Sequence, residues 1–417
     1  MVKDGGILTF TGKNNGDATN LIIENGGQLF VGSTGVKATI KKTITPSEAK
    51  TSNAWYAISS PTKNLPISTA VSGTHNVYRY DEENVLWEEY RNTANLFTTF
   101  ENGRGYLYRS TNGNISFAEE VNYSNVTYTL SRSSSIDKYK GFNLIGNPYS
   151  HDIYKGADGT AIPNDDILED KYCVLNTDGT WTLTDDGTAI HSGTAILVQA
   201  KSGSALTIAN TNSTGSKGRA YNDNIWFTVK NGDYSDAACV EFKEGRGFNK
   251  MAHYNENAPM LYINHNGENF ASVDMSDDTK VINLNFKAAT MGKYTLNLKA
   301  NGNFNYLHLI DKLTGEDVDM LFNDEYSFIG TPGDDNNRFI VRLSYTPDSD
   351  DNSIFAYQSG SDIVVNGAGE LQIFDVMGRF VMSEHINGVQ TINVPSQGVY
   401  IFRLIGTEVK TQKIVVR

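Results

Sequence analysis

Short runs of alternating hydrophobic and polar residues fill nearly the whole chain. Clusters of Gly, Asn, Asp and Ser separate the runs, and almost none has the period of an amphipathic helix. Alternation with a period of two is typical of strands that bury one face, and regularly spaced turn residues are typical of sandwiches and barrels. The pattern therefore predicts an all-β fold of tandem β-sandwich domains, with one helical turn at NDDILEDK (164–171).

Residues 1–45 contain three strand patterns, ILTFTG, NLIIENGGQLFVG and VKATIKKTI. Two interpretations are open. These strands are the last coils of a parallel β-solenoid, in which each coil covers its neighbour, or they form a hairpin that leads into the next domain.

Residues 46–215 contain an internal duplication of two units of about 85–90 residues each. Three pairs of segments match at a similar offset: WYAISSP (55–61) with FNLIGNP (142–148), VYRYDEENVLWEEY (77–90) with KYCVLNTDGTWTLT (171–184), and GYLYRSTNGNISF (105–117) with TAILVQAKSGSALTI (194–208). Trp87 and Trp181 align within the second pair. The repeat predicts two similar β-sandwich lobes packed on each other.

Two polar segments, NTNSTGSKG (210–218) and TPDSDDNS (346–353), have the composition of linkers. Residues 216–347 between them are predicted to form one further β-sandwich, and residues 354–417 a last domain. Seven strand patterns support the further sandwich: NIWFTVK, AACVEFK, MLYINHN, VINLNFK, GKYTLNLKA, YLHLIDKLTG and RFIVRLSY.

The composition, with 38 Gly, 22 Tyr and only 9 Pro, is typical of an extracellular all-β protein. The net charge is −13 and no cluster of Lys and Arg stands out, so we expect no nucleic-acid partner. No apolar run is long enough to span a bilayer, and Met1 is not followed by a signal-peptide pattern. Because the chain opens in mid-pattern with GGILTFTG, we interpret it as the C-terminal part of a longer protein.

The two cysteines, Cys173 and Cys239, are interpreted as buried free thiols in different domains. The chain is long enough to form its cores without disulfides. Patterns of a hydrolase serine elbow, of zinc ligands and of a phosphate loop are all absent from the sequence. Single histidines such as His265 and His308 fall in strand patterns and are interpreted as structural. We therefore expect no enzymatic activity.

Acidic turns and aromatic residues are the remaining candidates for binding. Asp165, Asp166 and Asp170 are the first candidates for calcium, which takes oxygen ligands from such loops, although a solvated turn is the favoured interpretation. No other cofactor is expected. Trp55, Trp87, Tyr106 and Trp181 are candidates for stacking on a carbohydrate, with packing in the core or in hairpins as the favoured alternative.

The last 64 residues carry three motifs in order: FDVMGR, GVY and a Lys before the final IVV. This region resembles the C-terminal sorting domain of type IX secretion cargo in Bacteroidetes. The matching positions are Asp375, Gly378, Arg379, Gly398, Tyr400 and Lys413. The resemblance implies a small Ig-like sandwich that the secretion machinery recognises, and that is often cleaved to leave the cargo on surface lipopolysaccharide or released. The Pro-Asn-Pro motif that opens many such domains is missing, which puts recognition and cleavage in doubt.

Upstream segments extend the resemblance over most of the chain from about residue 50. GFNLIGNPYS, FKAATMGKYTLNL, YLHLIDKLTGEDVDML and NRFIV are similar to long surface proteins of gut Bacteroidetes. The resemblance implies a non-catalytic, adhesin-like protein, secreted or held at the outer-membrane surface, with the secretion machinery and a glycan or host surface protein as partners. The alternative is a carbohydrate-binding accessory region of a larger surface protein or enzyme.

Overall fold

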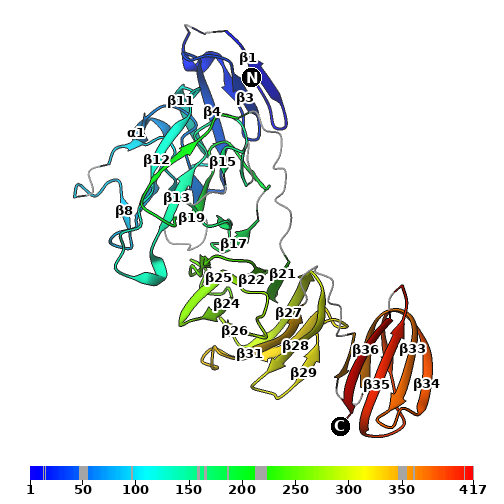
Figure 1. The fold of residues 1–417 in the computed structure, drawn as a ribbon. Coiled ribbons are helices and arrows are strands. Elements are labelled where there is room, and N and C mark those ends of the chain that lie inside the picture. Colours follow the sequence, from blue (N-terminus) through cyan, green and yellow to red (C-terminus); the bar gives the residue numbers. More distant parts are fainter. Residues whose placement is uncertain are drawn as a thin grey trace.

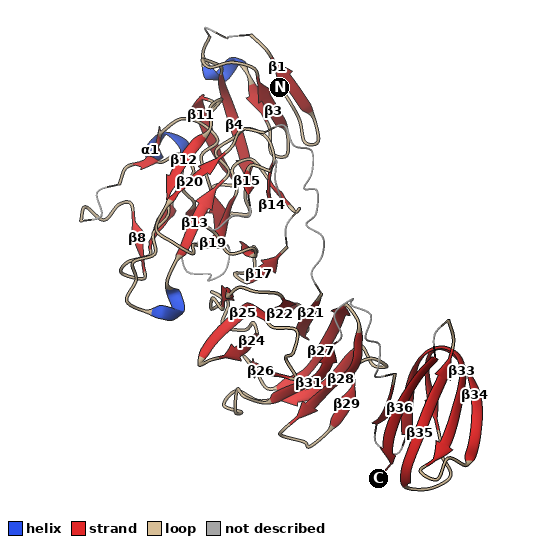
Figure 2. Cartoon of the chain, in the orientation of Figure 1, coloured by secondary structure: helices blue, strands red, loops and turns tan. Residues whose placement is uncertain are grey.

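The computed structural model is almost entirely β-structure, which confirms the all-β prediction (Figures 1 and 2). Among the described residues the helical elements are α1 (Ile67–Ala70) and the short 3-10 turns η1 (Ala18–Asn20) and η2 (Asp137–Tyr139). The structure describes residues 1–12, 14, 16–46, 55–94, 97–156, 160–163, 167–185, 187–211, 223–345, 355–359, 362–407 and 409–416.

Some predicted segments fall partly or wholly outside these residues. The linker predicted at 346–353 lies outside them, as does most of the one at 210–218. The helical turn predicted at 164–171 is wrong for its described part, because residues 167–171 form a short turn and bridge without a helix.

Two units with the same strand order make up most of the N-terminal body, drawn from blue to green in Figure 1. Unit A comprises β4 (Lys37–Thr43), β5 (Tyr56–Ile58), β6 (Leu65–Pro66), β7 (His75–Asp81), β8 (Leu86–Glu89), β9 (Thr99–Phe100), β10 (Tyr106–Ser110) and β11 (Asn114–Glu120). Unit B comprises β12 (Val126–Thr129), β13 (Phe142–Gly146), β14 (Ile153–Gly156), β15 (Ile162–Pro163), β16 (Tyr172–Leu175), β17 (Trp181–Thr184), β18 (Ala189–Ile190), β19 (Ala195–Gln199) and β20 (Ala205–Ile208).

The sheets of the two units correspond, except that β15 of unit B, which pairs with β14, has no counterpart in unit A. The order β5-β10-β7-β8 in unit A is matched by β13-β19-β16-β17 in unit B, and the pair β6-β9 by β14-β18. The pair β4-β11 is likewise matched by β12-β20. The repeating unit therefore begins at β4, ahead of the boundary predicted at residue 46.

The units meet through reciprocal contacts around the first strand of each four-stranded sheet. The two bridges are Ile58 to Thr194 and Ile145 to Arg104. Glycine allows this close approach, since a Cβ on Gly146 would lie 2.1 Å from Ser59 Oγ, and one on Gly105 would lie 2.6 Å from Ala195 Cβ. Any larger residue at these two positions would push the units apart.

The first 31 residues add parallel pairs to unit A. Strand β1 (Ile7–Phe10) pairs in parallel with β3 (Gln28–Val31), and β2 (Ile22–Ile23) pairs in parallel with β4. The pairing between these strands is parallel, as it is between the coils of a solenoid. The side chains of Ile23 and Leu29 are fully buried in the same core as Phe117 of β11, so this segment shares the core of unit A.

Residues 223–345 form one continuous sheet of eleven strands around a single core. All seven predicted strands are present, as β21 (Asn224–Asn231), β22 (Tyr234–Phe242), β24 (Met260–His265), β26 (Val281–Lys287), β27 (Gly292–Asn301), β28 (Phe304–Asp311) and β31 (Phe339–Tyr345). The prediction missed four: β23 (Gly247–Asn249), β25 (Glu268–Met275), β29 (Asp317–Asp319) and β30 (Glu325–Gly330).

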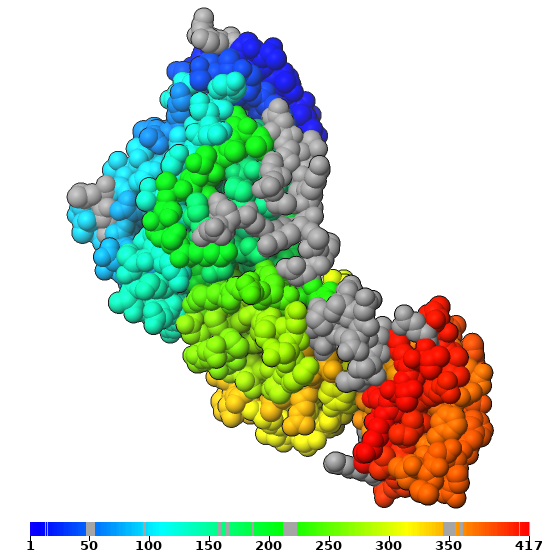
Figure 3. Space-filling model, in the orientation of Figure 1, coloured from blue at the N-terminus to red at the C-terminus, as the bar shows by residue number. Residues whose placement is uncertain are grey.

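This middle body packs directly on the N-terminal body, as the space-filling view shows (Figure 3). The four-stranded sheets of both units each bury one face against β21, β22, β23 and β25. Cys173 of β16 and Cys239 of β22 lie in this shared apolar cluster, and both are buried and free, as predicted. They belong to different bodies, but they lie in one cluster.

The terminal body consists of five strands around its own core, drawn in red in Figure 1. They are β32 (Ala356–Ser359), β33 (Asp362–Asp375), β34 (Phe380–Ile392), β35 (Gly398–Ile405) and β36 (Val409–Val416). Tyr357 joins it to the middle body, because its hydroxyl donates to Asp319 Oδ2 at 2.9 Å and its ring packs edge-on against Tyr306.

Candidate functional site

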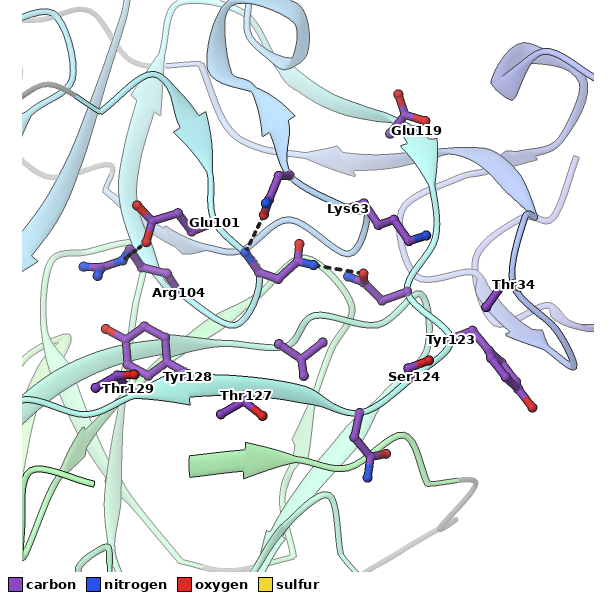
Figure 4. Close-up of a pocket in the computed structure, with 15 residues that line it drawn as sticks. Thr34, Lys63, Glu101, Arg104, Glu119, Tyr123, Ser124, Thr127, Tyr128 and Thr129 are labelled. Carbon is purple, nitrogen blue, oxygen red and sulfur yellow. Dashed lines mark hydrogen bonds and ion pairs between the residues drawn. The ribbon is translucent and has the colours of Figure 1, made fainter. Parts of the chain in front are cut away.

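A polar groove of about 870 Å³ lies between the loop that precedes β10 and strand β12 (Figure 4). We call it the β12 groove. Its lining comes from residues 63–64, from Glu101, Asn102 and Arg104 of the loop before β10, and from Glu119 and residues 122–129, with Thr34 at one end. The groove thus lies where unit A meets the first strand of unit B.

The loop side of the groove is held by a turn and by a buried tyrosine. Gly103 has φ +76°, a conformation that favours glycine. The backbone N–H of Glu101 donates to the Tyr106 hydroxyl at 2.8 Å. Arg104 Nε donates to Glu101 Oε2 at 2.8 Å, and its guanidinium lies 5.4 Å from the centre of the Tyr128 ring. The charged pair therefore stands at a fixed position over the strand.

Side-chain amides form the floor of the groove. The Asn102 backbone N–H donates to Asn64 Oδ1 at 3.3 Å, and its Nδ2 donates to Asn122 Oδ1 at 3.1 Å. Asn122 Nδ2 in turn donates to the Pro148 carbonyl at 2.7 Å. Asn102 Oδ1 is buried and has no hydrogen-bond partner among the described residues.

Three of the four charged residues that line the groove have an ion-pair partner within 2.8 Å, and the fourth, Glu119, has Lys37 at 3.8 Å. Lys63 Nζ lies 2.5 Å from Glu120 Oε1, and this pairing, more than any other contact, lowers the pKa of Glu120. Glu101 is paired with Arg104. The groups left to recognise a ligand are amides, hydroxyls and backbone, which suits an uncharged polar ligand. No cluster of His, Cys, Asp and Glu able to hold a metal is found among the described residues.

Of the four aromatic residues predicted to stack on a carbohydrate, Tyr106 and Trp181 are buried, and Trp55 and Trp87 are half-buried. Trp181 and Tyr106 are 3% and 0% exposed, so the hypothesis that they bind a ligand by stacking is wrong. Trp87 and Trp181 both pack on Tyr254 of the middle body, with ring centres 6.2 and 5.9 Å from it. Trp55 is half-buried under the Arg109 guanidinium. Their alignment in the repeat reflects their shared role at the interface between bodies.

The calcium candidates do not form a described site. Asp165 and Asp166 lie outside the described residues. Asp170 instead belongs to an ion-pair network between the bodies, with its Oδ2 at 2.5 Å from Lys243 Nζ. Lys243 also binds Glu241, at 2.6 Å. The ammonium of Lys243 therefore takes the position near Asp170 that a cation would need.

The residues singled out by the sorting-domain resemblance lie at one end of the terminal body. Asp375 Oδ1 accepts from the backbone N–H groups of Met377 and Arg379, at 2.9 and 3.0 Å, and Gly378 has φ +77° in this turn. The contact with the Arg379 N–H is the main cause that lowers the pKa of Asp375. Asp375 is opposite Tyr400 in the next strand.

The remaining motif positions continue the same region. Gly398 begins β35, two residues before Tyr400, whose hydroxyl donates to the Ser396 carbonyl at 2.8 Å. Lys413 is exposed on β36 and lies opposite Ile401. Three motifs that are distant in sequence thus meet on neighbouring strands.

Comparison with known proteins adds no further assignment: no family model, no curated protein and no solved structure matches this chain significantly. Among the described residues, no helix is both long and apolar enough to cross a membrane.

Proposed function

We propose that this chain belongs to a non-catalytic, adhesin-like protein, secreted or held at the cell surface and exported through residues 354–417. The main support is the clustering of Asp375, Arg379, Tyr400 and Lys413 at one end of the terminal body. This end is exposed: the Arg379 side chain is 80% accessible and Met377 is 78% accessible. Such a surface is available to a recognition partner without unfolding of the domain.

The terminal body also has the independence that an export signal needs. Its apolar core is formed by its own strands. Its described link to the rest of the chain is small, with Tyr357 against Tyr306 and Asp319. A domain of this kind can be recognised, and removed, without loss of the upstream cores.

The export proposal is tested in the native host with three altered chains. Deletion of 355–417, and the double substitution Arg379→Ala with Lys413→Ala, are expected to leave the protein in the periplasm. Arg403→Ala, an exposed cation on β35 outside the motifs, serves as the matched control and should reach the surface. Immunodetection on intact and fractionated cells gives the distribution. A truncated chain that still reaches the surface contradicts the proposal.

The binding half of the proposal rests on the β12 groove. The alternative of carbohydrate binding through aromatic stacking loses its main residues, because Tyr106 and Trp181 are buried. An adhesin-like role then depends on polar and backbone groups, which the β12 groove provides.

A further inference from the structure

The first strands of the two units, β4 and β12, are equivalent. The N–H of Ile44, just after β4, donates to the Gly113 carbonyl at 3.0 Å, and the N–H of Leu130, just after β12, donates to the Ser204 carbonyl at 2.9 Å. Both bonds continue the ladder to the last strand of the respective unit, so they fix the alignment of β4 with β12. The corresponding residues are therefore Lys41 with Thr127 and Thr43 with Thr129.

In unit A the second edge of β4 is covered by another strand. Strand β2 lies parallel to β4, and the Thr39 N–H donates to the Leu21 carbonyl at 2.8 Å. At the end of the same edge the Thr43 N–H donates to Asn25 Oδ1 at 3.2 Å. Residues 21–25 thus use the backbone groups along this side of β4.

In unit B the equivalent edge of β12 is open. Strand β12 pairs with β20 alone among the described residues. In an antiparallel ladder alternate residues direct their N–H and C=O groups toward the partner strand. Because Leu130 bonds to the β20 side, Tyr128 does so too, and Thr127 and Thr129 direct their backbone groups away from β20.

This open edge lies along the β12 groove. All residues from Asn122 to Thr129 line it, and Figure 4 shows β12 between the groove and β20. We propose that the groove binds an extended strand of a partner protein, which adds to β12 as β2 adds to β4. Addition of a strand to a sheet edge is a general mode of peptide recognition, in which the main chain gives affinity and side-chain pockets give specificity.

The charges indicate an uncharged partner strand. On β4, Lys41 is matched by Glu24 of the added strand at 3.0 Å. The equivalent residue on β12 is Thr127, and three of the four charged residues that line the groove already have a partner within 2.8 Å. A charged side chain entering the groove would therefore lose hydration without gaining a partner.

A polypeptide fits the open edge better than a glycan does. The edge presents backbone donors and acceptors at the two-residue spacing of a strand, which another extended backbone matches along its whole length. The inference goes beyond the proposed function because it does not depend on export: the groove can bind a strand whether or not the terminal body is a sorting signal.

Amide hydrogen exchange of the full chain tests the open edge directly. The amides of Thr127 and Thr129 should exchange much faster than that of Leu130, and also faster than that of Thr39, whose edge β2 covers. Protection of Thr127 and Thr129 equal to that of Leu130 would overturn the proposal.

Binding is tested with a phage-displayed library of random heptapeptides, selected on the wild-type chain. Selected peptides should be poor in charge. They should bind Thr127→Val as tightly as they bind the wild-type chain, since valine keeps the backbone N–H. They should bind Thr127→Pro at least about tenfold more weakly, because proline removes this donor and its ring occupies the strand edge. Thr127→Pro leaves the bonds to β20 intact, and circular dichroism checks its fold.

A second experiment modifies the peptide instead of the protein, and it applies if Thr127→Pro does not fold. The selected peptides are resynthesised in two forms, with backbone N-methyl groups at either the odd or the even positions, so that each form blocks one edge of the peptide strand. One of the two forms should lose binding to the wild-type chain. Three outcomes overturn the proposal: no enriched peptide, enriched peptides insensitive to both proline and methylation, or a groove ligand on a glycan array that is lost with Thr127→Val and kept with Thr127→Pro.

Discussion

The carboxylate of Glu82 is predicted to hold the two units together, and its removal tests how the duplicated body is stabilised. Glu82 follows β7 of unit A and is only 3% exposed. Its oxygens accept hydrogen bonds from unit B: from the backbone N–H groups of Ser133 and Gly141, both at 2.7 Å, and from the hydroxyl of Ser131 at 2.7 Å. One buried charge therefore satisfies several donors of a loop that belongs to the other unit.

The substitution Glu82→Gln should lower the free energy of unfolding of the N-terminal body by about 2–4 kcal/mol. Hydrogen bonds to a charged acceptor contribute roughly 1.5–3 kcal/mol, about twice as much as neutral ones. The amide keeps one oxygen, but its NH₂ faces a backbone N–H that then has no acceptor. Such an unsatisfied buried donor costs a further 1–3 kcal/mol or so.

The effect should depend on pH in a defined direction. Burial raises the pKa of Glu82, but the N–H groups of Gly141 and Ser133 and the Ser131 hydroxyl outweigh it, so the net pKa is below the usual value of 4.5. A lowered folded-state pKa means that the stabilisation is fully present above the unfolded-state pKa and is lost as the pH falls through the folded-state value. The difference between wild type and Glu82→Gln should therefore be largest at pH 7 and shrink below about pH 4.

Urea unfolding followed by tryptophan fluorescence at pH 7, 5 and 3.5 measures the difference. Glu83→Gln is the matched control, since Glu83 is the exposed neighbour of Glu82. The reasoning is refuted if both variants lose the same stability, or if the loss in Glu82→Gln is unchanged at the lowest pH at which both proteins fold.

Two further predictions concern the interface between the N-terminal and middle bodies. Burial raises the pKa of Cys173 to about 12 and also raises the pKa of Cys239. A thiol reagent at pH 8 should therefore modify neither cysteine in the native chain and both in denaturant. Rapid labelling of the native chain would contradict this burial. Burial and the nearby Glu241 raise the pKa of Asp274 to about 7, although Lys243, at 3.7 Å, acts in the opposite direction. Because the folded-state pKa is raised, ionisation of Asp274 lowers the free energy of unfolding as the pH rises from about 4 to 7. Asp274→Asn should therefore raise the melting temperature more at pH 8 than at pH 4, and an equal or opposite shift would show that the pair with Lys243 dominates.

The alternation of apolar and polar residues was sufficient to predict most strands, because burial of one face is a local property of the sequence. The seven strands predicted in the middle body are all present. Strand β30 was missed although its burial alternates along Glu325–Gly330, because it is short and follows a polar turn. Pairing was harder to predict. That β4 belongs to unit A depends on its pairing with β11, which is distant in the sequence and which the local pattern VKATIKKTI (36–44) does not reveal.

The candidate site was less predictable than the fold. Trp87 and Trp181 align in the repeat, but the sequence does not say which face of the hairpin meets another body, and the structure places Tyr254 there. The floor of the β12 groove joins Asn64, Asn102 and Asn122, which come from three separate loops and form no motif. One signal was available: the strand pattern NLIIEN (20–25) precedes β4, whereas the polar segment NYSN (122–125) precedes β12.

An open strand edge is normally a hazard, because it can pair with the edge of any other sheet. Strand β12 reduces this hazard in two ways. It is only four residues long, and its edge lies in a groove between the loop 101–104 and the segment 122–125 rather than at the margin of a flat sheet. A broad sheet of a second molecule cannot approach such an edge, whereas a single extended strand can enter the groove. Unit A, whose first strand is longer, has its edge covered by β2 instead. The two halves of the duplication thus treat the same edge differently, which is the physical reason to look for a strand ligand at β12.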